Sequence, residues 1–139
     1  MNAARARTVL VCDDEAPIRQ VIAHKLRAHG YVVHEARTGQ EGVDAVLGGL
    51  SPDLILSDLQ MPVMSGLEMC RVLREMAPTR ETPALMLTAR GYIIAPEDLE
   101  HTNIRQVIAK PFGVKQLVDR VRALLGPDRA PGDPSALAA

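Results

Sequence analysis

Charged or polar residues stand directly after several short apolar runs in this sequence of 139 residues. The runs cover residues 8–12, 54–57, 84–87 and 106–109. If they are parallel strands, the side chains that follow them meet at one edge of the sheet, because ligands of such sheets bind beyond the strands' carboxyl ends. The residues at these positions are Asp13, Asp14, Asp58, Thr88, Ala89 and Lys110. Three carboxylates, a hydroxyl and an ammonium group at one edge indicate a site for a cation and a charged reactant.

The negative charges of this set of residues are not balanced without a further cation. Asp13, Asp14 and Asp58 together carry a formal charge of −3, which Lys110 offsets only in part, and a divalent cation would make the sum neutral. Because every ligand on offer is an oxygen atom, Mg²⁺ fits best, and Mn²⁺ is also suitable. The alternative is that Asp13 and Asp14 only cap the helix that follows them. That alternative leaves Asp58 and Lys110 unexplained.

A carboxylate beside a cation and a lysine suits one reaction in particular, the transfer of a phosphoryl group to the carboxylate. The cation and Lys110 would offset the charge on the phosphoryl oxygens. Asp58 is the predicted nucleophile because it stands alone at the tip of the central strand. We expect no His, Cys or Ser side chain at these strand ends to be in a position to compete with it.

The elements that must position these residues alternate along the chain. The apolar runs above, with a further run at residues 31–33, are typical of strands buried on both faces, and helical apolar periods lie between them. The fourth helix is predicted to be short, beginning at Pro96 and ending near His101. The pattern predicts an α/β fold, namely a doubly wound, five-stranded parallel sheet with five helices. The predicted organisation is an N-terminal extension (residues 1–7), one domain (8–125) and a flexible C-terminal tail (126–139).

Composition excludes several other classes of function. The net charge of −1 argues against binding to nucleic acid or to anionic membranes through bulk charge. With only two tyrosines, one phenylalanine and no tryptophan, the chain lacks the aromatic side chains that stack on a flavin or on bases. Cys12 and Cys70 cannot form a disulfide framework or, alone, a zinc site. No apolar run is long enough to span a membrane, so the expected location is the cytoplasm.

Four motifs, in this order, resemble the response-regulator receiver domain, the CheY-like module of two-component signalling. Each follows a predicted strand, and the resemblance extends from about Thr8 to Leu125. They are VLVCDD at residues 9–14, DLQMPVMSG at 58–66, LTA at 87–89 and KPF at 110–112. Because no second domain follows in the sequence, we expect the stand-alone type, with output through protein contacts or by passing the phosphoryl group on.

The resemblance implies a role for each residue of the site. Asp58 would accept a phosphoryl group from a histidine kinase or phosphotransfer protein. Mg²⁺ would be bound by Asp14, by Asp58 and by the backbone carbonyl of Gln60, with Asp13 acting through a water molecule. Thr88, followed by Ala89, would contact the phosphoryl group as the switch, and Lys110 would pair with it after a cis Lys110–Pro111 bond. The only catalysis implied is self-phosphorylation from small donors and autodephosphorylation, so the domain is a signalling module rather than an enzyme.

The sequence also departs from the family's pattern. The family usually carries an aromatic switch residue three positions before the lysine, where this chain has Val107. A change of output would then run through Thr88 and the segment 89–95. Gln60 and Arg90 occupy the positions that tune the lifetime of the phosphoryl group in the family.

Three alternatives remain beside the signalling module. A haloacid-dehalogenase-like phosphatase needs a second aspartate two residues after the nucleophile, where this chain has Gln60. A flavodoxin-like electron carrier needs aromatic residues that are absent, and a colourless protein would exclude it. A pseudo-receiver, which binds a partner without phosphorylation, remains open because of Val107 and the unusual fourth helix.

Overall fold

The fold is that of a computed structural model, which describes residues 6–89 and 91–126. Five parallel strands form a single sheet in the order β2-β1-β3-β4-β5. The strands are β1 (Thr8–Cys12), β2 (Val32–Ala36), β3 (Leu54–Asp58), β4 (Ala84–Thr88) and β5 (Ile104–Ala109). The helices are α1 (Ala16–Ala28), α2 (Gly39–Leu47), α3 (Gly66–Arg74), α4 (Pro96–Glu100) and α5 (Val114–Leu125), with a 3₁₀ turn, η1, at Ala77–Thr79. The predicted fold class is therefore confirmed.

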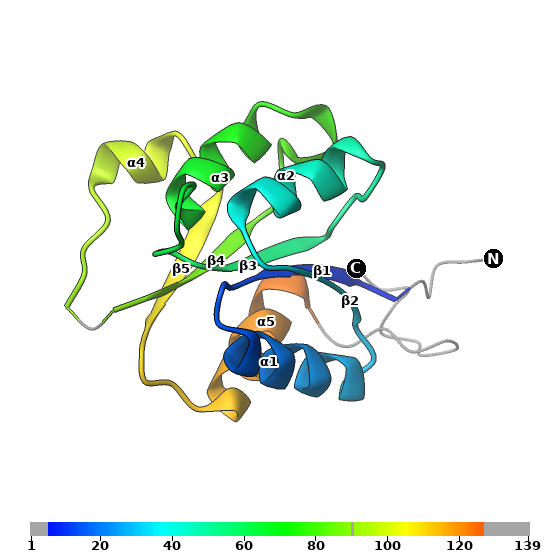
Figure 1. The fold of residues 1–139 in the computed structure, drawn as a ribbon. Helices are drawn as coiled ribbons and strands as arrows, with labels where there is room; N and C mark the ends of the chain where they lie inside the picture. The colour runs from blue at the N-terminus through cyan, green and yellow to red at the C-terminus, as the bar shows by residue number, and fades with distance from the viewer. Residues whose placement is uncertain (1–5, 90, 127–139) are drawn as a thin grey trace.

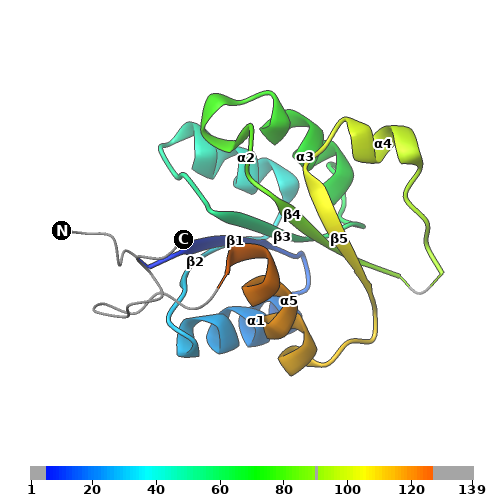
Figure 2. The same cartoon turned by 180° about the vertical axis from the view of Figure 1, so that it is seen from behind.

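The sheet is covered on both faces, as Figures 1 and 2 show. Helices α1 and α5 lie on one face, and α2, α3 and α4 lie on the other. Alternate residues of a strand point to opposite faces. Val9 and Val11 accordingly pack with α1 and α5, whereas Leu10 and Cys12 pack with α2 and α3. The central strands β3 and β4 are buried along their whole length, which explains their continuous apolar sequences.

The two edge strands are longer than their sequences predict. The predicted strand at residues 31–33 is in fact Val32–Ala36, and the one at 106–109 begins at Ile104. Both edge strands alternate between buried and exposed positions. The expectation of continuous apolar runs was wrong here because an edge strand tolerates polar residues on its solvent-facing side.

The fourth helix is as short as the sequence predicts, and α4 has no buried residue. Two arginines of α3 hold it in place. Arg71 forms an ion pair with Asp98, and Arg74 donates a hydrogen bond of 2.9 Å to the carbonyl of Glu100 at the end of the helix. A cation at this position also interacts favourably with the helix dipole.

Some expectations fall outside the described residues. Arg90 is one, and so are nearly all of the predicted N-terminal extension and C-terminal tail. Among the helices that the structure describes, none combines the length and the apolar character needed to cross a membrane.

Val63, between β3 and α3, has an unusual backbone conformation, with φ = 69° and a fully exposed side chain. An L-residue in this left-handed region loses roughly 1–2 kcal/mol, and asparagine tolerates it better than other residues with a Cβ atom. We therefore expect Val63→Asn to stabilise the fold by about 1 kcal/mol, measured by urea unfolding. Val63→Ala, which removes apolar surface but keeps Cβ, is the control. An equal gain from alanine would show that backbone strain is not the cause.

Candidate functional site

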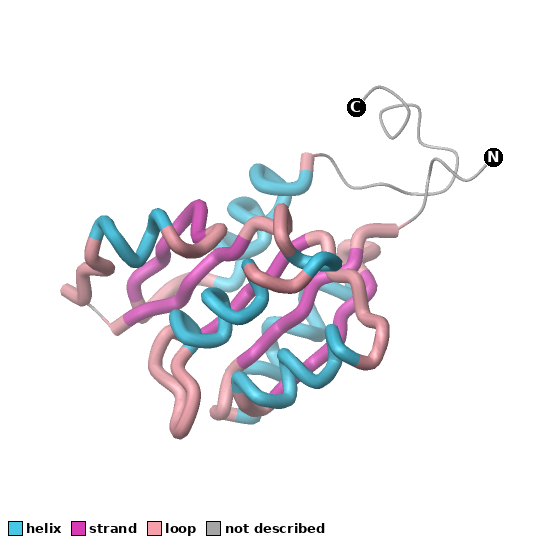
Figure 3. The backbone as a smooth tube through the Cα atoms, turned by 90° about the horizontal axis from the view of Figure 1, so that it is seen from above, coloured by secondary structure: helices cyan, strands magenta, loops and turns pink. Residues whose placement is uncertain are grey.

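The sheet register brings the predicted acidic residues together at one edge. Cys12 of β1 pairs with Ser57 of β3, so Asp13, which follows β1, comes level with Asp58, the last residue of β3. Seen from above, the strands run side by side with helices crossing over them (Figure 3). Helix α1 then passes to one face of the sheet and α3 to the other (Figure 1). Such a change of direction between neighbouring strands opens a crevice at the carboxyl edge of the sheet.

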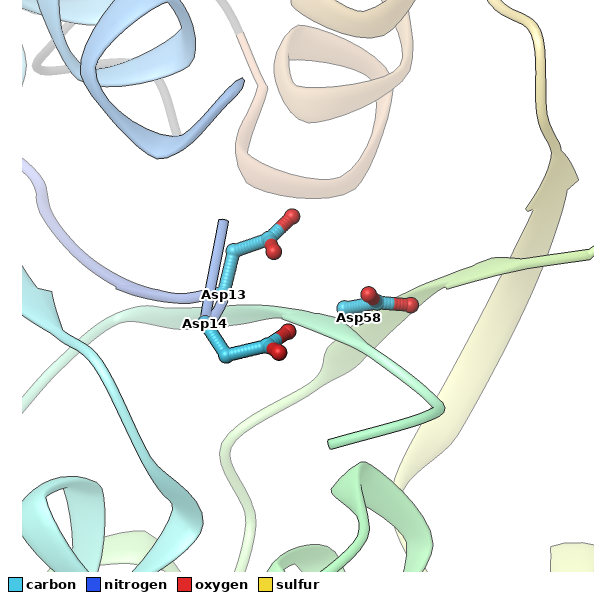
Figure 4. A group of neighbouring side chains, drawn as sticks. All are labelled: Asp13, Asp14 and Asp58. Carbon is cyan, nitrogen blue, oxygen red and sulfur yellow. The ribbon is translucent and has the colours of Figure 1, made fainter. Parts of the chain in front are cut away.

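Three carboxylate groups come together at this edge of the sheet. One oxygen each from Asp13, Asp14 and Asp58 lies within 4.8 Å of the other two. In Figure 4, Asp13 and Asp14 extend from the segment after β1 towards the side on which Asp58 lies. Asp13 and Asp58 are buried, whereas Asp14 is exposed to solvent.

Asp58 is held through both of its carboxylate oxygens. Its Oδ2 accepts a hydrogen bond of 3.1 Å from Lys110 Nζ, and its Oδ1 accepts one of 3.3 Å from the backbone N–H of Gln60. Lys110 Nζ also lies 3.6 Å from Glu15 Oε1. Burial alone lowers the pKa of Lys110, but its hydrogen bond to Asp58 and the charges of Asp58, Asp13 and Glu15 outweigh burial and raise that pKa. Lys110 is therefore a firmly protonated cation beside Asp58.

Asp13 carries the feature that points most directly to a ligand. Its Oδ1 accepts a hydrogen bond of 2.9 Å from the backbone N–H of Glu15, but its buried Oδ2 has no partner. Burial raises the pKa of Asp13, as do the charges of Asp58 and Asp14, while the N–H of Glu15 and Lys110 oppose the rise. A buried, unpaired carboxylate oxygen costs stability. A hard cation among these three carboxylates would give that oxygen a partner, so the residues present fit such an ion.

The other predicted residues lie around this cluster. Thr88 is the buried last residue of β4, one position beyond Leu87, which pairs with Asp58 in the sheet. Ala89 follows it and is exposed, as is Gln60. The Lys110–Pro111 peptide bond is cis, as the resemblance implied. Val107 lies on edge strand β5 with 40% of its surface exposed.

Two potential nucleophiles stand directly before aspartates of the site in the sequence. Cys12 and Ser57 stand at or next to the ends of β1 and β3, but neither side chain is available. The Cys12 thiol packs against Met69, and burial raises its pKa far above the usual range. The Ser57 hydroxyl donates a hydrogen bond of 2.9 Å to the carbonyl of Asp58. Asp58 thus has no competitor from these two side chains.

Sequence reasoning missed two residues next to the cluster, Arg19 and Glu35. Arg19 is only 7% exposed and donates a hydrogen bond to the carbonyl of Asp13. A signal was present, because Arg19 shares a helical face with Ile22 and Leu26, both of which are buried. A charged residue on the buried face of a helix needs an ionic or hydrogen-bonding partner.

Comparison with known proteins decides the family. The family model described as the response regulator receiver domain matches residues 9–122 of this chain. The chain belongs to this family. Receiver domains are the signalling modules of two-component response regulators rather than classical enzymes, and they interact with histidine kinases or phosphotransfer proteins. They generally bind Mg²⁺ at an acidic pocket.

This receiver domain resembles the receiver portions of longer proteins. It is 40% identical over 134 residues to the phosphate regulon transcriptional regulatory protein PhoB of Pseudomonas aeruginosa, covering 94% of this chain and 56% of PhoB. It is 39% identical over 127 residues to the transcriptional regulatory protein ResD of Bacillus subtilis, covering 90% of this chain and 50% of ResD. The chain thus spans about half the length of these curated relatives.

Solved structures include receiver domains of similar size. The chemotaxis response regulator CheY4 of Vibrio cholerae superposes with a TM-score of 0.77 at 31% identity, covering 86% of this chain and 99% of CheY4. The receiver domain of the sensor histidine kinase PA1611 of Pseudomonas aeruginosa superposes with a TM-score of 0.76 at 26% identity, covering 88% of this chain and 99% of that one. The PA1611 structure has a magnesium ion coordinated in its active-site cleft.

Proposed function

We propose that this receiver domain is a Mg²⁺-dependent phosphoacceptor, phosphorylated on Asp58 by a histidine kinase or phosphotransfer protein. The observation that carries the proposal is the pairing of Asp58 with Lys110 inside a cluster of three carboxylates, one of which has a buried oxygen without a partner. A pseudo-receiver has no need for such a cluster, whose mutual repulsion lowers its stability.

The reaction follows from the positions of these residues. A carboxylate oxygen of Asp58 attacks the phosphorus atom of a phosphohistidine, the new P–O bond forms as the P–N bond breaks, and the imidazole leaves and takes up a proton. Lys110 offsets charge on the phosphoryl oxygens. Asp13, Asp14, Asp58 and the carbonyl of Gln60 would hold Mg²⁺, which supplies further charge neutralisation at the phosphoryl group.

The remaining residues concern what happens after transfer. We assign Thr88, with Ala89, the role of contacting the phosphoryl group and moving the segment that follows β4. Gln60 and Arg90 are assigned to the control of phosphoryl lifetime. Val107 has no aromatic ring to change rotamer, so output through a protein contact is proposed to depend on the segment 89–95.

An apolar cavity of about 730 Å³ beside Lys110 supports a protein as phosphodonor. Its lining includes Ile18 and Val21 of α1 and, after β5, Pro111 and Phe112. Val21 is 53% exposed beside this cavity, so its apolar surface is available for contact with a partner. A helix that carries a phosphohistidine could bury apolar residues here while its phosphoryl group reaches Asp58.

Intact-mass spectrometry after incubation with acetyl phosphate and Mg²⁺ tests the proposal. We expect one added phosphoryl group, absent when EDTA is included and absent in Asp58→Asn. Asp119→Asn, which alters an exposed carboxylate on α5, is the matched control and should still gain the group. If folded protein gains nothing, even at early times and with phosphoramidate as a second donor, the pseudo-receiver becomes the better description.

Mg²⁺ is also expected to raise the melting temperature of the unphosphorylated protein. Binding to the native state alone stabilises it by about 1.4 kcal/mol at ten times the dissociation constant. Ca²⁺ prefers six to eight oxygen ligands, more than this cluster offers, so its effect should be smaller. Differential scanning calorimetry with each ion at millimolar concentration measures both effects, and the absence of any shift with Mg²⁺ would argue against the site.

A further inference from the structure

An ion pair between buried Arg19 and partly exposed Glu35 lies next to Asp13 of the acidic cluster. Arg19 of α1 donates a hydrogen bond of 3.1 Å from Nε to Oε1 of Glu35, in edge strand β2. The same guanidinium group donates a second hydrogen bond, of 2.9 Å, from Nη1 to the carbonyl oxygen of Asp13. Arg19 therefore links β2 to the first residue after β1, and its side chain is only 9% exposed.

The backbone N–H and carbonyl groups of Asp13 are both hydrogen-bonded. Its N–H donates a hydrogen bond of 3.1 Å to the carbonyl of Ala36, and its carbonyl accepts the bond from Arg19. Its side chain is held at Oδ1 by the N–H of Glu15. Every polar atom of Asp13 thus has a partner except Oδ2, the oxygen left for a cation.

We propose that Arg19, oriented by Glu35, is a positioning residue that sets the direction of the Asp13 carboxylate, and of the Asp14 carboxylate that follows it, for cation binding. The inference rests on the proposed function in that it takes Mg²⁺ as the cation. Arg19 does not touch the cation or the phosphoryl group. It acts by preventing rotation of the peptide unit between Asp13 and Asp14, whose carbonyl oxygen it holds.

The chemistry of arginine suits this role better than that of lysine. A guanidinium group is planar and directs several N–H groups in fixed directions, so it can bond Glu35 and the Asp13 carbonyl at once. A lysine ammonium group is a single point of charge on a flexible chain. Lysine at position 19 should therefore keep the ion pair with Glu35 but lose the fixed hold on Asp13.

The chain offers a control for the pairing with Glu35 in Arg27, a half-exposed residue on the same helix. Arg27 also pairs with Glu35, at 3.1 Å, and also donates to a backbone carbonyl, that of Val33, at 2.9 Å. It makes no hydrogen bond to Asp13. Arg27→Gln therefore removes the same kinds of contact as Arg19→Gln while leaving the hold on Asp13 intact.

The test is the dissociation constant for Mg²⁺, measured by isothermal titration calorimetry at a temperature where every variant is folded. Loss of a residue that orients a metal ligand typically weakens metal binding 10- to 100-fold, so we expect at least about a tenfold loss for Arg19→Gln. The loss for Arg27→Gln should be less than about twofold, because that variant leaves the Asp13 contact untouched. Arg19→Lys should also bind Mg²⁺ more weakly than the wild type, and it serves if Arg19→Gln does not fold.

The possible outcomes separate the inference from the function on which it rests. If wild-type protein does not bind Mg²⁺, the proposed function loses its metal and the inference falls with it. If wild-type protein binds Mg²⁺ but Arg19→Gln binds it equally well, only the inference is overturned. Equal weakening by Arg19→Gln and Arg27→Gln would also overturn it, because general loosening around Glu35 would then be the cause.

Discussion

In the presence of EDTA, Asp13→Asn is expected to melt at a higher temperature than the wild-type receiver domain. Asp13 places a buried carboxylate oxygen without a partner beside the carboxylates of Asp14 and Asp58. Asparagine keeps an oxygen for the N–H of Glu15, removes one negative charge and adds N–H groups that can donate to Asp58. Relief of a buried unpaired group should stabilise the variant by about 1–2 kcal/mol.

The same substitution should remove most of the stabilisation by Mg²⁺. Melting curves of both proteins, with EDTA and with millimolar Mg²⁺, are therefore expected to diverge, with the variant more stable without the ion and less responsive to it. Asp119→Asn, at an exposed position, should change neither value. An Asp13→Asn variant that is less stable in EDTA would contradict the view that the cluster is strained without a cation.

In EDTA, the difference in stability between Asp13→Asn and the wild-type protein should also depend on pH. Burial, together with the charges of Asp58 and Asp14, raises the pKa of Asp13 in the folded protein. For a carboxyl group whose pKa is raised by folding, the loss of stability begins as the pH rises past the pKa of the unfolded chain and is complete above the raised pKa of the folded protein. The advantage of asparagine should therefore be largest above the raised pKa of Asp13 and shrink as the solution is acidified into the range where Asp13 gains its proton.

Gly66→Ala is expected to be the most destabilising of the small substitutions near the site. A Cβ atom at this first residue of α3 would lie 2.4 Å from the backbone oxygen of Asp58 and 3.0 Å from Oγ of Ser57. Backbone atoms at the end of a buried central strand cannot move aside easily, and such overpacking costs roughly 1–3 kcal/mol. We expect about 3 kcal/mol, near the top of that range, together with weaker Mg²⁺ binding because Asp58 is displaced.

Gly42→Ala provides the comparison. Its Cβ would lie 2.8 Å from Sδ of Met69, but a methionine side chain is flexible and can shift. Alanine also favours the helical conformation that Gly42 has within α2. Urea unfolding should show a change of less than about 1 kcal/mol for Gly42→Ala. Equal losses for the two variants would show that contact with the Asp58 backbone is not the cause.

Much of the fold could be predicted from the sequence because central strands and helix periods leave clear patterns. β1 was predicted with its exact bounds, and α4 to within one residue at its end. The edge strands were predicted too short because polar residues such as Glu35 are acceptable at an edge. The η1 turn was not predicted, because its sequence APT carries no apolar period.

The acidic cluster could be predicted because it requires only that parallel strands end together. Its surroundings could not, since they depend on contacts between distant segments. Nothing in the local sequence indicates that Arg19 reaches across to Glu35, or that Cys12 turns towards Met69 and away from the site. The chain resembles its relatives over roughly half of their length. This similarity assigns the family, but it does not identify these contacts.

Reductive trapping of the phosphorylated residue tests the central claim most directly. Borohydride reduces an acyl phosphate to an alcohol. The aspartate that accepted the phosphoryl group is thereby marked by a stable alcohol side chain. After incubation with acetyl phosphate and Mg²⁺, followed by borohydride and peptide mapping, we expect the mark on Asp58 alone. A mark on Asp13 or Asp14, or an adduct that leaves no mark on any carboxylate, would contradict the assignment of Asp58 as the phosphoacceptor.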